Sequence, residues 1–242
     1  MSKVISSASH HAMLFAFIAK RTIDKFGKNG EKAVTDGVRH YGEQRGHRMA
    51  LRTLADGNQL DVENYLIYGE WSAAPGEMDL RFPRYSPEVR MENHKCPWYT
   101  EWEKRGLLKY GAYYCRDVDA SLARGYNGME LKLLANRTLG DELCDFVFAG
   151  CSIPDERMAE FAAKREKIGG KARMPWEYHI GHLYSAMREA IIKAFGDEGD
   201  MAVHEAMDDY KNEYGQEAYD LVLQYADIDY NAMPQYEGID KK

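Results

Sequence analysis

The sequence lacks both an excess of positive charge and any long apolar segment. Its 242 residues include 32 Lys and Arg against 39 Asp and Glu, which gives a net charge of −7. The basic surface that nucleic-acid binding needs is therefore absent. The apolar run near the start, residues 12–19, is far too short to span a bilayer. We expect no nucleic-acid partner and no membrane partner.

Cysteine and recognisable cofactor motifs are scarce as well. The four cysteines lie at positions 96, 115, 144 and 151, too few for a disulfide-dense secreted scaffold. The run at 12–19 has a counterpart later in the chain that cannot be a signal peptide, so we expect reduced thiols and a cytoplasmic protein. There is no phosphate-cradling glycine loop, no dinucleotide fingerprint and no Ser-His-Asp signature.

The chain is instead rich in apolar residues (45%) and in tyrosine (17 residues), enough to bury a sizeable core. Residues 10–46 align without a gap with residues 179–215. Each copy predicts an amphipathic helix that ends at a Phe-Gly pair, a short turn and a second helix; the alternative is that unrelated helical hairpins with glycine breaks look alike. We interpret residues 1–150 as a ligand-binding or catalytic α+β core and residues 151–242 as a helical extension that packs on it.

Residues 90–150 hold the densest set of turn and cap signals. Alternating apolar residues predict strands at 78–82 and 89–91, and a hairpin over 131–148 that turns at Gly140-Asp141. Pro97 predicts a helix start. Asp61 and Asp117 predict caps of further helices, the second of which should end at Gly125. The fold class is α+β, an antiparallel sheet with helices packed against it and a C-terminal helical hairpin.

Three short patterns follow one another in this segment. They are Cys96-Pro97, then Cys115 with Asp117, then residues 138–141 (TLGD) leading to Cys144-Asp145-Phe146. In this order and spacing they resemble the L-2-amino-thiazoline-4-carboxylic acid hydrolase family over roughly residues 90–148, with weaker similarity through the N-terminal helices. That family is similar to the 4-vinyl reductase small-molecule-binding domain. The resemblance implies this fold and hydrolytic ring opening at an amidine-like carbon.

The resemblance also predicts which residues would bind a zinc ion. In sensor proteins of the broader group, a cysteine of the central helix and an acid with two cysteines on the last hairpin hold the metal. Cys115 and Cys144 match the first and last of these positions, whereas Leu133 and Asn136 occupy the other two. With this departure we expect no cofactor; if zinc does bind, its ligands are Cys115 and Cys144.

Opening a cyclic amidine needs a nucleophile, a proton donor and a cation for any substrate carboxylate. Cys115 precedes Asp117, where we expect a helix to begin, and the exposed amides of a helix start favour a thiolate. A buried cysteine that only packs is the alternative. We assign catalysis to Cys115 or an activated water, with Asp117 and His94 assisting and Cys144 on the facing hairpin.

The substrate contacts are predicted from arginine and aromatic side chains. Arg90 and Arg137 could clamp a carboxylate with their planar guanidinium groups, with surface exposure as the alternative. Aromatic residues at helical spacing belong partly to the core, and Trp98, Tyr99 and Tyr114 are expected to line the pocket.

The function that we predict is hydrolysis of a C–N or C=N bond in a small heterocyclic substrate, a cyclic amidine or an amide-like ring. Two alternatives remain. A non-catalytic small-molecule-binding module would return its ligand unchanged, and a lyase or isomerase would differ from a hydrolase in its mass balance with water. Exposed apolar helix faces make a homodimer the expected assembly.

Overall fold

The computed structural model describes residues 6–234, and these form two compact units. Unit 1 contains residues 6–41, 96–118 and 176–228; unit 2 contains residues 42–95, 119–175 and 229–234. The helices α1 (Ala8–Ala55) and α4 (Leu108–Asn127) each contribute residues to both units. This division does not coincide with the predicted boundary at residue 150. The predicted organisation into a core and a helical extension stays a prediction.

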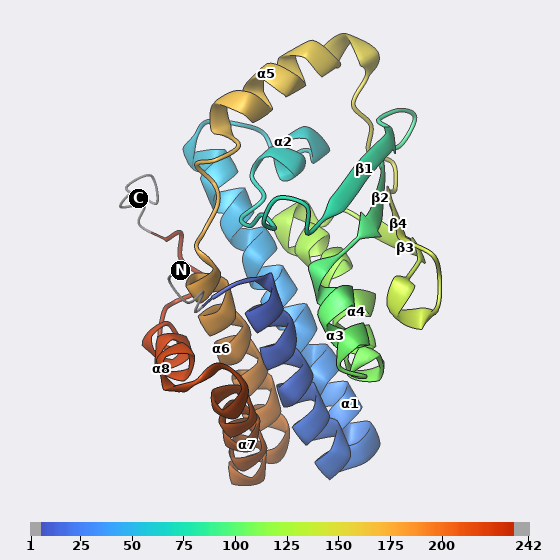
Figure 1. Ribbon diagram of the computed structural model, residues 1–242. Helices are drawn as coiled ribbons and strands as arrows, with labels where there is room; N and C mark the ends of the chain where they lie inside the picture. Colours follow the sequence, from blue (N-terminus) through green and yellow to red (C-terminus); the bar gives the residue numbers. More distant parts are fainter. Residues whose placement is uncertain (1–5, 235–242) are drawn as a thin grey trace. The chain divides into compact units, whose positions relative to one another are not determined.

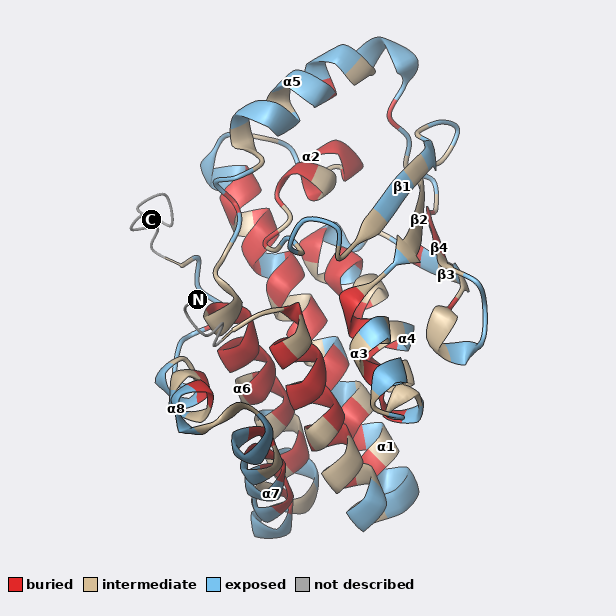
Figure 2. Cartoon of the chain, viewed as in Figure 1, coloured by how far each residue is buried: buried red, intermediate tan, exposed pale blue. Residues whose placement is uncertain are grey.

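The secondary-structure elements in the described part of unit 1 are all helices. Besides its parts of α1 and α4 it contains α3 (Pro97–Lys104), α6 (Trp176–Phe195), α7 (Asp197–Tyr214) and α8 (Gln216–Gln224). Figure 2 shows α6 buried along much of its length, in agreement with the buried run from Tyr178 to Tyr184. Helices over the two aligned segments, residues 10–46 and 179–215, were predicted and are confirmed.

The two aligned hairpins share an unusual turn, which lies in unit 1 in both copies. Gly27 breaks α1 with φ 56° and ψ −132°, and Gly196 separates α6 from α7 with φ 58° and ψ −138°. Both conformations lie in the positive-φ region that residues other than glycine rarely adopt. The preceding residues, Phe26 and Phe195, stack with ring centroids 3.8 Å apart. The predicted Phe-Gly helix ends are therefore correct in both copies.

Unit 2 contains the sheet, whose strand order is β1-β2-β4-β3 with every pair antiparallel (Figure 1). The strands are β1 (Asp79–Arg84), β2 (Arg90–Lys95), β3 (Leu131–Ala135) and β4 (Cys144–Phe148). A short 3-10 helix, η1 (Arg137–Leu139), and left-handed Gly140 join β3 to β4. The helices of this unit include α2 (Val62–Ile67) and α5 (Met158–Ile168), the latter preceded by η2 (Asp155–Arg157).

The sheet has a charged face and a core face. Along β2, Arg90, Glu92 and His94 alternate with Met91 and Asn93, so the two sets point to opposite sides. Met91 packs against the hydrophobic core of unit 2, which places Asn93 on the core side. That core joins residues of α1, α2, α4, α5 and the sheet, among them Met49, Val62, Tyr65, Leu122, Tyr126, Leu131, Phe146, Phe148 and Phe161.

Most local predictions hold, and one fails in a way that matters for the site. The Asp61 side chain caps α2 by accepting from the backbone N–H of Asn64, and α3 begins at Pro97. The helix predicted to begin at Asp117 and to end at Gly125 is wrong, because α4 runs unbroken from Leu108 to Asn127. Asp117 therefore lies inside a helix and cannot cap one.

Two glycines allow α1 and α4 to approach closely within unit 2. A Cβ atom on Gly46 would overlap the carbonyl oxygen of Leu122, and one on Gly125 would overlap that of Glu43. Because the obstacles are backbone atoms, side-chain rotation cannot relieve the overlap. We predict that Gly46→Ala lowers the free energy of unfolding by about 1–3 kcal/mol, measured by urea denaturation.

Gly170→Ala is the matched control for this substitution. A Cβ atom there meets no heavy atom within 4 Å, so its effect should stay within about 0.5 kcal/mol. Equal denaturation midpoints for the two variants would contradict the close approach.

Candidate active site

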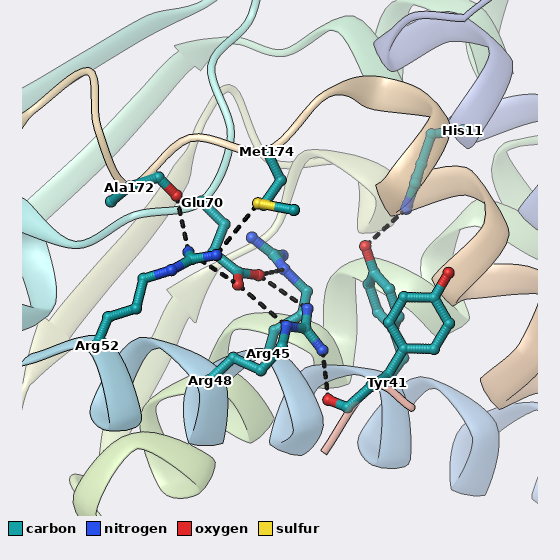
Figure 3. A network of polar contacts seen from close by, with 9 residues as sticks. His11, Tyr41, Arg45, Arg48, Arg52, Glu70, Ala172 and Met174 are labelled. Atoms are coloured by element: carbon teal, nitrogen blue, oxygen red, sulfur yellow. Dashed lines mark hydrogen bonds and ion pairs between the residues drawn. The ribbon is translucent and has the colours of Figure 1, made fainter. Parts of the chain in front are cut away.

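Three arginines of α1 surround one glutamate in the interior of unit 2 (Figure 3). Arg45, Arg48 and Arg52 are spaced by three and four positions, which puts them on one side of the helix. Arg48 donates two hydrogen bonds to the Glu70 carboxylate, at 3.1 and 2.9 Å. Arg52 and Arg45 approach the same carboxylate at 3.3 and 3.6 Å. Glu70 is fully buried, so one shared carboxylate stabilises three guanidinium groups that water barely reaches.

This arginine cluster (Arg45, Arg48, Arg52 and Glu70) also holds distant backbone segments of the unit. Arg48 donates to the carbonyl oxygen of Tyr230 at 2.8 Å, and Arg52 donates to that of Ala172 at 2.8 Å. The backbone N–H of Met174 donates to the carbonyl oxygen of Glu70 at 2.6 Å. The cluster thus fixes α1 against two connecting segments.

Asp119 is an acid on the side of α4 that faces the core of unit 2. Leu122, Ala123 and Tyr126 follow it at helical spacing and are buried. Burial raises the pKa of Asp119 from 3.8 to about 6, and the charge of Arg45 opposes the increase. Within residues 6–234 the carboxyl has no hydrogen-bond or ion-pair partner, although the residue remains partly accessible to solvent. A general acid–base group needs this combination of a pKa near neutrality and an unoccupied carboxyl.

Helices α1 and α2 each carry a group that interacts electrostatically with Asp119. Burial raises the pKa of Tyr65, the negative charge of Asp119 adds to the increase, and Arg45 opposes it. The Tyr65 ring packs edge-on against Phe148 at 5.3 Å. The guanidinium of Arg45 lies over the ring of Trp71 at 3.6 Å, a cation–π contact. Asp119 therefore interacts electrostatically with a buried phenol and with a buried cation.

Cys144 of β4 completes the group on the sheet. Burial raises the pKa of its thiol, the backbone N–H of Arg137 opposes this by donating to Sγ at 3.5 Å, and the charge of Asp119 raises the pKa further. Cys144 faces Asn93 across the β2–β4 ladder. We call Asp119, Tyr65, Arg45, Cys144 and Asn93 the acid site.

The other predicted residues of unit 2 lie around the hairpin and on the charged face. Arg137 donates to the backbone carbonyl oxygen of His94 at 3.0 Å, whereas the His94 side chain lies on the charged face and Cys144 lies on the core face with Asn93. The His94 ring contacts Glu92 at 3.0 Å. Arg90 holds both oxygens of Asp145, at 2.9 and 2.8 Å, so clamping a substrate carboxylate would require this pair to break.

The remaining predicted residues belong to unit 1. Cys115 lies in the middle of α4 and not at a helix start, so the argument for a thiolate from exposed helix amides fails. Asp117 binds Arg39 and Arg116 at 2.8 and 3.0 Å. The proximity of Cys115 to Cys144 stays a prediction.

The aromatic residues predicted for the pocket differ in their surroundings. The Trp98 indole N–H donates to Nδ1 of buried His11 at 3.0 Å. Tyr114 is buried and packs edge-on against the His11 ring at 5.6 Å. The Tyr99 hydroxyl donates to Glu103 at 2.6 Å. Trp98 and Tyr114 therefore belong to the core of unit 1, in line with the expectation that aromatic residues at helical spacing are partly core.

Sequence reasoning missed Asp119, Tyr65 and the arginine cluster of unit 2. Asp119 could have been found as the one acid in the apolar series with Leu122 and Tyr126. The spacing of Arg45, Arg48 and Arg52 predicts a shared helix face, but nothing in the pattern names Glu70 as their partner. Tyr65 carries no signal beyond its place after a helix cap.

Residues 6–234 contain no group of three or more His, Cys, Asp or Glu side chains arranged to hold a metal ion. Zinc binding by Cys115 and Cys144 stays a prediction. Over the same residues, no helix has the length and apolar character that crossing a membrane requires.

The fold and the site together define an α+β protein with an acid of raised pKa beside buried polar groups. More specifically, the chain belongs to the L-2-amino-thiazoline-4-carboxylic acid hydrolase family, whose model matches residues 7–148. The predicted resemblance is thereby confirmed, and the family is named for a hydrolase. The matched range includes the whole arginine cluster and the whole acid site. No curated protein and no solved structure matches the chain.

Proposed function

We propose that the protein hydrolyses the ring C–N bond of a small cyclic amidine that carries a carboxylate, with Asp119 as the group that moves protons. The observation that carries this proposal is the Asp119 carboxyl, which has a pKa of about 6 and no partner among residues 6–234. The family's named substrate class supplies the amidine and the carboxylate.

The chemistry requires one water molecule, and both of its protons end on the ring nitrogen. Ionised Asp119 takes a proton from water as its oxygen adds to the C=N carbon of the amidine, and gives this proton to the ring nitrogen. Asp119 then takes the remaining proton of the added hydroxyl and gives it to the same nitrogen as the carbonyl forms and the C–N bond breaks. The product has a new carbonyl group and a free amine, and the carboxylate of Asp119 is regenerated. A pKa near neutrality suits both steps, because the same group must accept and release a proton.

Water is favoured over Cys144 as the nucleophile. Burial and the nearby charge of Asp119 raise the pKa of the Cys144 thiol, so the thiol stays protonated at neutral pH and attacks poorly. The roles first assigned to Cys115, Asp117 and His94 are not needed for this sequence of steps. Arg45, a buried cation that interacts with Asp119, is suited to attract the substrate carboxylate.

Incubation with 2-amino-2-thiazoline-4-carboxylate in ¹⁸O-labelled water tests the proposal. We expect ring opening with one labelled oxygen in the product, measured by mass spectrometry, and the same rate for the surface control Glu130→Gln. Unlabelled product would instead indicate a lyase or isomerase. Ligand that binds and returns unchanged would indicate a binding module, and either result would overturn the proposal.

A further inference from the structure

An amide side chain on the core face of the sheet has no partner inside the described protein. The Oδ1 atom of Asn93 is buried and accepts no hydrogen bond, and neither end of the amide is held by another group within residues 6–234. Buried polar atoms in folded proteins are nearly always hydrogen-bonded, so an exception calls for a ligand or an ordered water. Asn93 lies opposite Cys144 in the β2–β4 ladder, and Cys144 interacts electrostatically with Asp119.

A second unfilled polar atom lies at the adjoining hairpin. Asn136 uses its Oδ1 to accept from the backbone N–H and the hydroxyl of Thr138, at 2.9 and 2.7 Å. Its Nδ2 is buried and has no partner. The next residue, Arg137, donates its backbone N–H to Cys144. Two amides with unfilled hydrogen bonds therefore flank Cys144, one across the ladder and one at the turn.

We infer that Asn93 is the residue that recognises the ring edge of the substrate, pairing its amide with the N–C=N group of a neutral cyclic amidine. This inference rests on the proposed function. A neutral amidine edge presents an N–H donor beside a nitrogen acceptor. An asparagine amide presents an oxygen acceptor beside an N–H donor at matching separation, as in its two-bond contact with the edge of adenine. A carboxylate in the same place could only accept hydrogen bonds.

The pairing predicts how the protein binds related rings. In a 2-oxo ring the edge is reversed, with a carbonyl acceptor beside a ring N–H donor. Rotation of the Asn93 amide by half a turn restores both hydrogen bonds. Wild-type protein should thus bind the 2-amino and 2-oxo rings with similar affinity. A variant with aspartate at this position should bind only a ring edge that offers two donors, which is the edge of the protonated amidine.

Isothermal titration calorimetry on the full chain tests this, with 2-amino-2-thiazoline-4-carboxylate and 2-oxothiazolidine-4-carboxylate as probes. Asn93→Leu should weaken binding of both rings by about 10- to 100-fold, because both hydrogen bonds are lost. Asn93→Asp should keep the amino ring within about threefold and weaken the oxo ring by about 30-fold or more. The ratio of the two affinities does not depend on the folded fraction, so partial unfolding of a variant cannot imitate the result.

Asn29→Asp and Asn29→Leu repeat the same chemical changes at an exposed asparagine and should change neither affinity. The inference alone is overturned if wild-type protein opens the amino ring while both Asn93 variants keep wild-type affinities, or if Asn93→Asp weakens the two rings equally. Wild-type protein that binds neither ring overturns the inference and the proposed function together. Selective binding without ring opening supports the role of Asn93 and contradicts the hydrolase.

Discussion

Asp119→Asn is expected to lower kcat for ring opening by about 10²–10⁴-fold, the usual contribution of a positioned proton-transfer group. The amide is nearly isosteric but cannot take a proton from water. In wild-type protein, kcat/KM should rise with pH through about 6, where Asp119 becomes ionised, and the residual activity of the variant should be independent of pH in that range. Steady-state kinetics between pH 5 and 8 give both quantities.

The same substitution is expected to stabilise the fold at neutral pH. In the unfolded chain an aspartate loses its proton near its ordinary pKa of 3.8, whereas folded Asp119 keeps it until about pH 6. Between these values the native state binds more protons than the unfolded state, so stability falls as pH rises through this window. At pH 8 the penalty amounts to about 3 kcal/mol at most, and Asp119→Asn removes it.

Urea denaturation of both proteins at pH 4 and pH 8 measures this difference. The variant should gain stability relative to wild type on going from pH 4 to pH 8. Glu130→Gln, a surface acid, should show no such gain. A variant that loses activity and also loses stability at pH 8 would indicate that Asp119 holds the fold together, and this would contradict a role in proton transfer.

The local elements of the fold could be read from the sequence because their signals are local. Pro97 at a helix start, Asp61 as a cap and Gly140 in a hairpin turn each act on the backbone within a few residues. Gly125 was misread because a glycine inside a helix and a glycine after a helix look the same in sequence. The difference lies in the backbone of Glu43, more than 80 positions away.

The site predicted from the sequence depended on these wrong helix boundaries. A helix that starts at Asp117 makes Cys115 a candidate thiolate and Asp117 a candidate acid. In the helix that runs from Leu108 to Asn127, Asp117 is instead an ion-pair partner of two arginines. The candidate acid is then Asp119, which lies about 200° further round the helix. Tyr65 and Asn93 were assigned to the acid site from their tertiary neighbours, which periodicity does not record.

Glu70→Gln is expected to lower the free energy of unfolding by about 3–5 kcal/mol, the cost of removing one partner from a buried ionic group. Glutamine keeps the volume of Glu70 but replaces the carboxylate that Arg45, Arg48 and Arg52 share, at 2.9–3.6 Å, with a neutral amide. The amide also turns one acceptor into a donor that faces guanidinium donors. The midpoint of urea denaturation at constant slope measures the loss.

Two matched variants separate the buried network from an ordinary ion pair. Glu160→Gln removes one partner of Arg157 in a pair whose acid is 68% exposed, and exposed pairs contribute about 0–1 kcal/mol. Arg48→Met removes one cation but leaves Glu70 in contact with Arg45 and Arg52, so its cost should fall between the other two. If Glu70→Gln proved as mild as Glu160→Gln, the arginine cluster could not be what fixes α1 to the segments at Ala172 and Tyr230. The burial of Arg45, whose charge acts on Asp119, would then need another cause.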